Sequence, residues 1–172
     1  MTTLPQLTRI LVNVSRGNAK VYGIVSSPSA KSSSEQFTTP QRMLHVRRGS
    51  VAYPGDTVND LGFYYVLGDF SRTANDAIFR MFHLPFNGDV QRISHQTDPV
   101  SGFARNEAMS KIGKTWYDVR PLGQTADVNN SKRQRYRIIT GFPLQDGDLI
   151  GPSNYRISNV KFELGVTVAE AE

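Results

Sequence analysis

The chain has 172 residues, 38% of them hydrophobic, and its 20 Lys and Arg outweigh 15 Asp and Glu to give a net charge of +5. This length favours a single domain, 1–172, with room for a long loop or arm. The absence of cysteine excludes disulfides and thiolate metal sites, and no apolar run approaches the roughly 18 residues of a membrane-spanning helix. The mild positive charge permits contact with nucleic acid or an acidic protein surface, but a dedicated DNA-coating protein is normally richer in Lys and Arg.

The chain opens with short β-type runs. Residues 8–14 (TRILVNV) and 19–25 (AKVYGIV) are rich in β-branched residues, and the four residues between them have the composition of a hairpin turn. No basic segment followed by an apolar segment precedes them. We therefore expect no signal peptide, and synthesis in a cytoplasm.

Residues 26–42 (SSPSAKSSSEQFTTPQR) change character. They hold six Ser and two Pro and almost no large apolar residue, so they cannot bury enough surface to fold alone. The segment is predicted to be either a mobile surface loop or an interface arm that becomes ordered on a neighbouring subunit. Phe37 is its one obvious apolar anchor.

Further strands are predicted on both sides of a Gly-Asp pair. Residues 43–53 are predicted as a strand that ends in a glycine turn, and Gly55–Phe70 (GDTVNDLGFYYVLGDF) follows. Residues 77–84 (AIFRMFHL) alternate in character before Pro85 stops them, which favours a strand over a helix.

The block at 85–131 is the least regular part and is interpreted as a possible insertion. Asn87-Gly-Asp89 is a hairpin-type turn before a short strand over 90–94. Residues 105–112 have the best helical composition in the chain, and Gly113 would end such a helix after one or two turns. Residues 116–120 (WYDVR) are predicted to form a strand.

Positive charge gathers in two segments. In a strand over 132–140 (KRQRYRIIT), alternate residues share one face, so three arginines would line up about 6.5–7 Å apart. Such a row suits phosphates or the acidic side chains of another subunit, and the alternative is a solvated edge strand whose charges prevent aggregation. The candidate anion-contacting residues are Arg47, Arg48, Lys132, Arg133, Arg135 and Arg137.

The Gly-Asp pair occurs a second time near the end of the chain, at the start of residues 147–168. A match between the two copies aligns Tyr64–Val66 with Tyr155–Ile157. An Asp after a Gly can accept backbone N–H groups and hold a tight bend, whereas a calcium loop would need further oxygen ligands and a closing Glu. The predicted turn-forming residues are Gly55, Asp56, Gly147 and Asp148.

The sequence has no recognisable catalytic motif. Its three histidines (His45, His83 and His95) lie on separate segments without metal-ligand spacing, and it has neither a nucleophile elbow nor a phosphate-binding glycine loop. We expect no catalytic or metal-binding residue, no cofactor and no enzymatic activity. Many short strands with turn signals predict an all-β fold, a small barrel or sandwich with at most one short helix.

The pattern Gly-Asp-x-Ile, Tyr-x-Ile, Val-x-Phe, mainly within Gly147–Gly165, resembles the closing β-segment of tailed-bacteriophage head–tail connector, or head-closure, proteins. This resemblance implies a structural virion protein that forms a homo-oligomeric ring at the neck and extends the DNA channel. The implied partners are further copies of the chain, portal, adaptor or tail components, and DNA passing without sequence specificity. The loop at 26–42 matches the channel loop of that family in character only.

Other functions remain open at this point. One is a capsid decoration or other tail structural protein, which would also be located in the virion after assembly in the host cytoplasm. Another is a nucleic-acid-binding β-barrel module that uses Arg133, Arg135 and Arg137. A third is an unrecognised enzyme. A salt-dependent affinity for DNA would favour the nucleic-acid module, and a ring-shaped oligomer would favour the connector.

Overall fold

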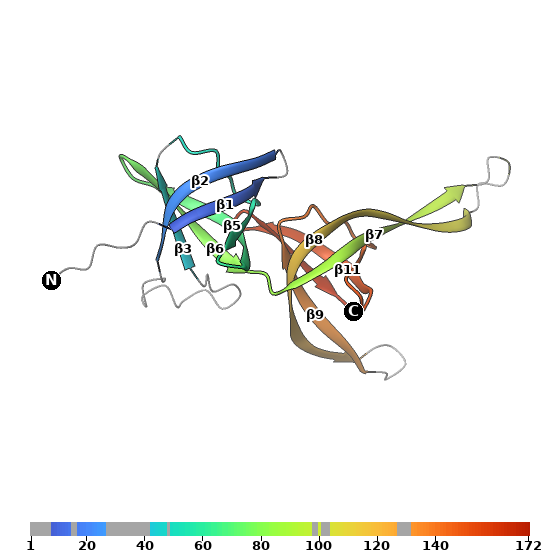
Figure 1. Cartoon of the computed structure of the whole chain (residues 1–172). Helices are drawn as coiled ribbons and strands as arrows, with labels where there is room; N and C mark the ends of the chain where they lie inside the picture. Colours follow the sequence, from blue (N-terminus) through green and yellow to red (C-terminus); the bar gives the residue numbers. More distant parts are fainter. Residues whose placement is uncertain are drawn as a thin grey trace. The chain divides into compact units, whose positions relative to one another are not determined.

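The computed structural model describes residues 8–14, 17–26, 42–47, 49–97, 100, 104–126 and 132–172 (Figure 1). All regular secondary structure in these ranges is β-strand, so the predicted all-β fold is confirmed, in its barrel form. The strands are β1 (Thr8–Val14), β2 (Gly17–Ser26), β3 (Arg42–Arg47), β4 (Thr57–Asp60), β5 (Phe63–Arg72), β6 (Asp76–His83), β7 (Phe86–Thr97), β8 (Ala104–Ala126), β9 (Lys132–Thr140), β10 (Leu149–Ile150), β11 (Tyr155–Glu163) and β12 (Val166–Ala171).

The short helix predicted at 105–112 was wrong. These residues lie in β8, where Glu107 is opposite His95 and Met109 is opposite Ile93 on the antiparallel strand β7. A helix of about eight residues is marginal in water. The ladder with β7 pairs every residue from Asn106 to Lys111, so tertiary pairing overrides their helical composition.

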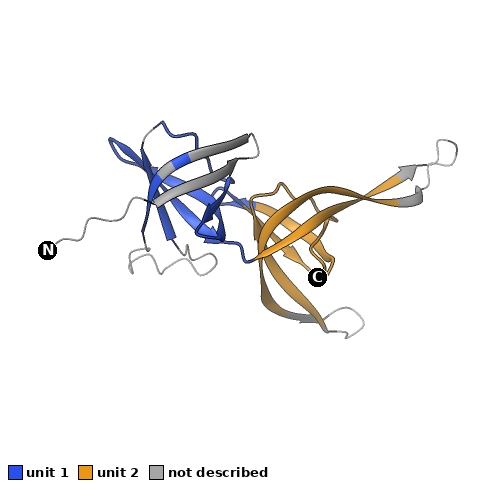
Figure 2. Ribbon diagram, viewed as in Figure 1, with its two compact units in different colours: residues 1–85, 162–166 blue, residues 86–161, 167–172 orange. Residues whose placement is uncertain are grey.

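The chain forms two compact units (Figure 2), where the sequence predicted one domain with an insertion at 85–131. Unit 1 comprises Met1–Pro85 with Phe162–Val166, and unit 2 comprises Phe86–Lys161 with Thr167–Glu172. Most of the supposed insertion builds β7 and β8, two of the longest strands of unit 2. Much of the length of β7 and β8 lies outside the core. The composition of this block is therefore polar, and the sequence did not indicate two long strands.

Unit 1 contains a closed six-stranded barrel in the order β1-β2-β3-β6-β5-β4. All neighbours are antiparallel, and β4 closes the ring by pairing with β1, where Val58 lies opposite Val12. Alternate residues of the strands point inward. They fill the interior with a cluster whose buried members are Val21, Leu44, Val46, Ala52, Val58, Tyr65, Leu67, Phe79 and Met81.

Unit 2 is a strongly curled sheet in the order β10-β11-β12-β9-β8-β7. It closes only through the two-residue strand β10, where Ile150 lies opposite Val90 and Leu149 lies opposite Gln91 of β7. Its own core cluster has the buried members Val90, Tyr117, Ile138, Leu144, Ile150, Ile157, Ala169 and Ala171.

The two barrels have the same topology. In each, the first three strands are adjacent in order, the sixth pairs with the third, and the fourth pairs back with the first. Val58 and Ile150 occupy the same position, on the fourth strand opposite the first, and both are fully buried. The chain is therefore built from two copies of one six-stranded fold, which accounts for the repeated Gly-Asp pair.

Each Gly-Asp pair forms the same four-residue turn ahead of the fourth strand. The Asp56 N–H donates to the Tyr53 carbonyl at 3.2 Å, and the Asp148 N–H donates to the Gln145 carbonyl at 3.1 Å. The glycine at the third position has φ 89° in both copies. A type II turn requires this left-handed conformation, which glycine adopts without steric cost.

The aspartate completes the turn in both copies. Asp56 Oδ2 accepts the Tyr53 N–H at 2.8 Å, and Asp148 Oδ2 accepts the Gln145 N–H at 2.8 Å. The carbonyls of the two aspartates accept the N–H groups of Leu67 and Ile157, both at 2.8 Å. The side chain thus holds the bend, and the main chain passes directly into the sheet.

These hydrogen bonds correct the alignment of the two copies by one residue. Since Leu67 and Ile157 make equivalent bonds, Tyr155 corresponds to Tyr65 and not to Tyr64. Tyr65 lies opposite Val58, as Tyr155 lies opposite Ile150. The first copy has two more residues between Asp and Tyr, nine positions against seven, and an even difference keeps both tyrosines on the same face.

The shared turn predicts equal costs for Gly55→Ala and Gly147→Ala. A Cβ at Gly147 meets nothing within 4 Å, and one at Gly55 meets only the Gly165 carbonyl oxygen at 3.8 Å. Each substitution should therefore lower the free energy of unfolding by only the left-handed penalty, about 1–2 kcal/mol. Denaturant unfolding followed by circular dichroism measures both.

Gly165→Ala is the contrasting variant. Its φ is 78°, but its Cβ would also lie 2.6 Å from Pro54 Cβ and 2.9 Å from the Asp69 backbone nitrogen. It should cost more than either turn variant, because backbone has to move. A difference between Gly55→Ala and Gly147→Ala of more than about 1 kcal/mol would contradict the equivalence of the turns.

Candidate functional site

Asp148 combines its turn role with a buried ion pair. It is 1% exposed, and Arg92 of β7 binds it with both ends of the guanidinium group, Nε to Oδ1 at 2.7 Å and Nη2 to Oδ2 at 2.8 Å. Arg92 lies next to Gln91, which is opposite Leu149 in the closing pair of strands. The ion pair therefore links the turn to β7, the strand with which β10 pairs.

The Asp148 carboxyl is held in its charged form. Burial alone would raise its pKa, but hydrogen bonds from Arg92 and from the Gln145 backbone, together with the Arg92 charge, hold the pKa below its usual value. The hydrogen bond to Asp148 in turn raises the pKa of Arg92. These directions are those of a structural ion pair, and neither group is left free to exchange a proton near neutral pH.

Unit 1 has a different buried carboxylate beside its fourth strand. Asp60, at the end of β4, accepts a hydrogen bond from Arg42 Nη1 of β3 at 2.6 Å. The Arg42 guanidinium also lies 5.7 Å from the centre of the Tyr65 ring, which packs against His83. Burial is the main cause that raises the Tyr65 pKa. This group therefore links β3 to β4, two strands that are not adjacent in the ring.

The predicted row of arginines on β9 is matched by acids. Arg135 forms an ion pair with Glu170, and Arg133 Nη1 lies 3.3 Å from Glu172 Oε2. β12 runs antiparallel to β9, and Glu170 is opposite Arg137 in the register. The spacing of Glu170 and Glu172 could have predicted these ion pairs. Residues two apart lie on one face of a strand, so the two acids share a face in the same way as Arg133 and Arg135.

The remaining predicted contacts are scattered. Arg47 is exposed at the end of β3. The structure does not describe the side chain of Lys132. It also does not describe Arg48, Phe37 or the loop predicted at 26–42, apart from the two end residues of that loop. Among the described side chains, the structure therefore does not bring the basic residues together into one surface.

The most distinctive surface is a ribbon formed by the outer parts of β7 and β8 (Figure 1). Within the described residues, Arg92–Thr97 and Ala104–Ser110 pair only with one another. Both outer edges of this ribbon therefore carry backbone N–H and C=O groups without a strand partner. An isolated two-stranded ribbon is marginally stable in water, so it gains from a further strand.

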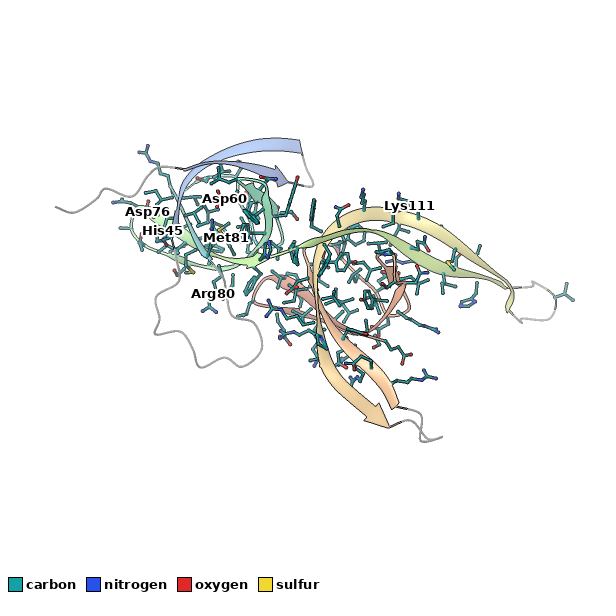
Figure 3. The ribbon with its side chains drawn as sticks, turned by 60° about the horizontal axis from the view of Figure 1, so that its bottom comes forward. His45, Asp60, Asp76, Arg80, Met81 and Lys111 are labelled. Atoms are coloured by element: carbon teal, nitrogen blue, oxygen red, sulfur yellow. The ribbon has the colours of Figure 1, made fainter. Side chains whose placement is uncertain are left out.

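The two faces of the ribbon differ. One face carries the cross-strand pair Ile93 and Met109, and Met109 is 63% exposed. The other face is polar, and the Ser94 hydroxyl donates to the Ala108 carbonyl at 3.2 Å. Lys111, labelled in Figure 3, stands exposed on β8 at the base of the ribbon. The first face therefore offers an apolar contact beside unpaired edges.

Two bulges on β8 expose further apolar side chains. Ile112 is the extra residue between the pairs formed by Gln91 and Val90, and Leu122 is the extra residue before Gly123. They are 37% and 46% exposed. Bulges bend a strand and redirect a side chain. β8 thus presents Met109, Ile112 and Leu122 to solvent along one strand.

The histidine side chains of unit 1 contact a hydroxyl group and aromatic rings. His45 Nε2 lies 2.9 Å from the Ser26 hydroxyl, and the ring of His83 lies between those of Phe63 and Tyr65. In this part of the chain, no group of three His, Asp or Glu side chains is arranged to hold a metal ion. Nor does it contain a helix with the length and apolarity of a membrane-spanning segment.

Comparison with protein-family models, with curated proteins and with solved structures returned no match for this chain.

The Arg92–Asp148 pair predicts a specific acid sensitivity. Because the folded-state pKa of Asp148 is depressed, its contribution to stability is present above the unfolded value, about 3.9, and is lost as pH falls through the folded value. Asp148→Asn should lower the free energy of unfolding by about 2 kcal/mol at pH 7. Below about pH 4 the free energy of unfolding of this variant should fall less steeply with decreasing pH than that of the unaltered protein. Urea unfolding at several pH values measures this.

A double-mutant cycle checks the assignment. Arg92→Ala and Asp148→Asn should be non-additive at pH 7 by about 1–3 kcal/mol, because either change removes the same pair. Additive costs, or an unchanged acid limb in Asp148→Asn, would contradict it.

The acids beside the arginine row also give a prediction. Replacing Glu170 and Glu172 by Gln should remove the carboxylate partners of Arg133 and Arg135 and strengthen binding to heparin, with a salt slope steeper by about one per arginine that then binds the polyanion. The control is Asp76→Asn with Glu163→Gln, which changes the net charge equally at exposed positions. Equal effects of the two double variants would show that only net charge matters.

Proposed function

We propose that this chain is a structural subunit that joins copies of itself into a ring, at the head–tail junction of a tailed bacteriophage, where the ring extends the DNA channel. The observation that carries the first part is the β7–β8 ribbon. It has two unpaired edges and an apolar cross-strand pair, the half-buried Ile93 and the exposed Met109, and it is too small to be stable alone.

Strand addition is the assembly mode that these features favour. An extended segment or strand from a second copy would pair with an edge of the ribbon through backbone hydrogen bonds, and the apolar face would supply the side-chain contact. Contacts between different surfaces of identical subunits generate a closed ring when the rotation closes. Met109, Ile112 and Leu122 are the exposed apolar residues available to such a contact on β8.

The position in the virion rests on the resemblance of Gly147–Gly165 to the closing segment of head–tail connector proteins. In this chain that segment holds β10 and β11 and the start of the turn into β12. A capsid decoration or tail protein would use the same kind of contact at another place. A nucleic-acid-binding module is less favoured, because the arginines at 133 and 135 already pair with Glu172 and Glu170.

The proposal predicts that the ribbon drives self-association. Mass photometry and negative-stain microscopy of the purified chain should show ring-shaped oligomers. Replacement of Ile93–Met109 by the two-residue turn Asn-Gly, which suits a tight hairpin between Arg92 and Ser110, removes the apolar pair and should give monomers whose circular dichroism still shows the folded barrels. A chain that stays monomeric at about 100 µM in sedimentation, roughly the range of weak but specific contacts, would overturn the proposal.

A matched pair of point variants separates the contact from a general charge effect. Met109→Glu places a charge on the apolar face and should weaken self-association at least tenfold. Ala108→Glu places the same charge one residue away, on the other face, where the residue is also exposed. It should have little effect. Equal weakening by both would remove the apolar face from the contact.

A further inference from the structure

Unit 1 contains a cavity of about 320 Å³ beside its core. Its walls come from the end of β3, the loop that follows, the end of β5 and the start of β6. The lining residues are Val46, Arg47, Gly49, Ser50, Ala52, Tyr53, Phe70, Arg72, Ala77 and Phe79. This volume lies at the lower end of the range for small-molecule sites, about 300–1,000 Å³.

The strand register explains why a cavity exists here. Ala77 lies opposite Val46 on one side and opposite Arg72 on the other, so these three form one row across the sheet. In the next row, Phe79 lies between Leu44 and Phe70 and fills the core. The small side chain of Ala77 leaves the outer row unfilled, and apolar residues form the floor of the space.

Two positive charges stand at this cavity. The Arg72 guanidinium carbon lies 4.9 Å from the centre of the Phe70 ring, and Arg47 lines the cavity from the end of β3. Neither guanidinium group forms an ion pair with any described residue, and the lining contains no carboxylate. The Ser50 hydroxyl is already used, since it donates to the Arg47 carbonyl at 2.6 Å.

We infer that this cavity binds a small aromatic carboxylate. The ring would pack on Phe70 and Phe79, where aromatic pairs are favourable, and the carboxylate would meet the guanidinium groups of Arg72 and Arg47, which bind carboxylates with two parallel hydrogen bonds. Both parts of the ligand are needed. An apolar group without the acid leaves the cations unpaired, and an acid without the ring leaves the floor unfilled.

Titration of the full-length chain with indole-3-acetate tests the inference, with the neutral indole-3-acetamide as its counterpart. In two-dimensional ¹H–¹⁵N spectra the acid should shift the signals of residues that line the cavity, and it should bind at least tenfold tighter than the amide. Equal affinities, shifts confined to other residues, or no binding of the acid at millimolar concentration would overturn the inference. This comparison uses the unaltered protein and so does not depend on how any variant folds.

Three variants locate the site. Arg72→Ala should lower the affinity for the acid to that of the amide, and Ala77→Ile should abolish binding because it fills the cavity. Arg80, labelled in Figure 3, is a residue of β6 that lies beside Asp69 and does not line the cavity. Arg80→Ala removes the same charge as Arg72→Ala, but this variant should bind the acid normally. Loss of binding in Arg80→Ala equal to that in Arg72→Ala would count against the site.

The same chemistry occurs in a free acid and at the carboxyl end of a peptide that finishes in an aromatic residue. A short peptide ending in Phe with a free carboxylate, compared with its amidated form, distinguishes the two sources. Tighter binding of that peptide than of indole-3-acetate would assign the cavity to a protein terminus, and the reverse would assign it to a free acid.

Discussion

Closure of the strand ring is the constraint on which each barrel depends. A curled sheet with two free edges leaves a row of backbone groups unpaired, and in both units the fourth strand removes those edges by meeting the first. That strand is short, with four residues in β4 and two in β10. In both units this strand begins directly after the aspartate of the Gly-Asp turn. In unit 2, where only two residue pairs close the ring, the Arg92–Asp148 ion pair adds a link that backbone pairing alone does not provide.

The length of β8 accounts for the main difference between two units of the same topology. The corresponding strand β2 has ten residues, whereas β8 has 23. The excess leaves the barrel at both ends, once with β7 and once with β9. Each departure coincides with a bulge. Ile112 is extra between the residues opposite Val90 and Gln91, the two residues of β7 that pair with β10. Leu122 is extra just beyond the last pair of β9 with β12. Bulges increase local bend and twist, which lets a strand leave the curve of the sheet.

Local patterns in the sequence were enough to predict the all-β class, strands such as β6 and β9, and the repeated turn. The signals for these features are alternation, β-branched residues and the Gly-Asp pair, and each of them extends over only a few positions. The second barrel was not predictable in this way. Its longest strand has a helical composition over 105–112. The short strand predicted over 90–94 covers only part of β7, and the predicted turn at Asn87–Asp89 was wrong, because these residues lie within β7 and pair with β8. The ion pairs of Arg133 and Arg135, and the row of Val46, Ala77 and Arg72, likewise depend on register between separate strands.

Two barrels that each close by the same turn are free to differ elsewhere. Val58 and Ile150 hold equivalent buried positions in the two rings. Unit 1 has small residues, Ala52 and Ala77, where a barrel is normally filled, and the resulting space carries two unpaired cations. Unit 2 has instead extended a strand pair into solvent. The proposed ligand site and the proposed assembly contact therefore share no residue, and a ligand would alter assembly only if the two sites were energetically coupled.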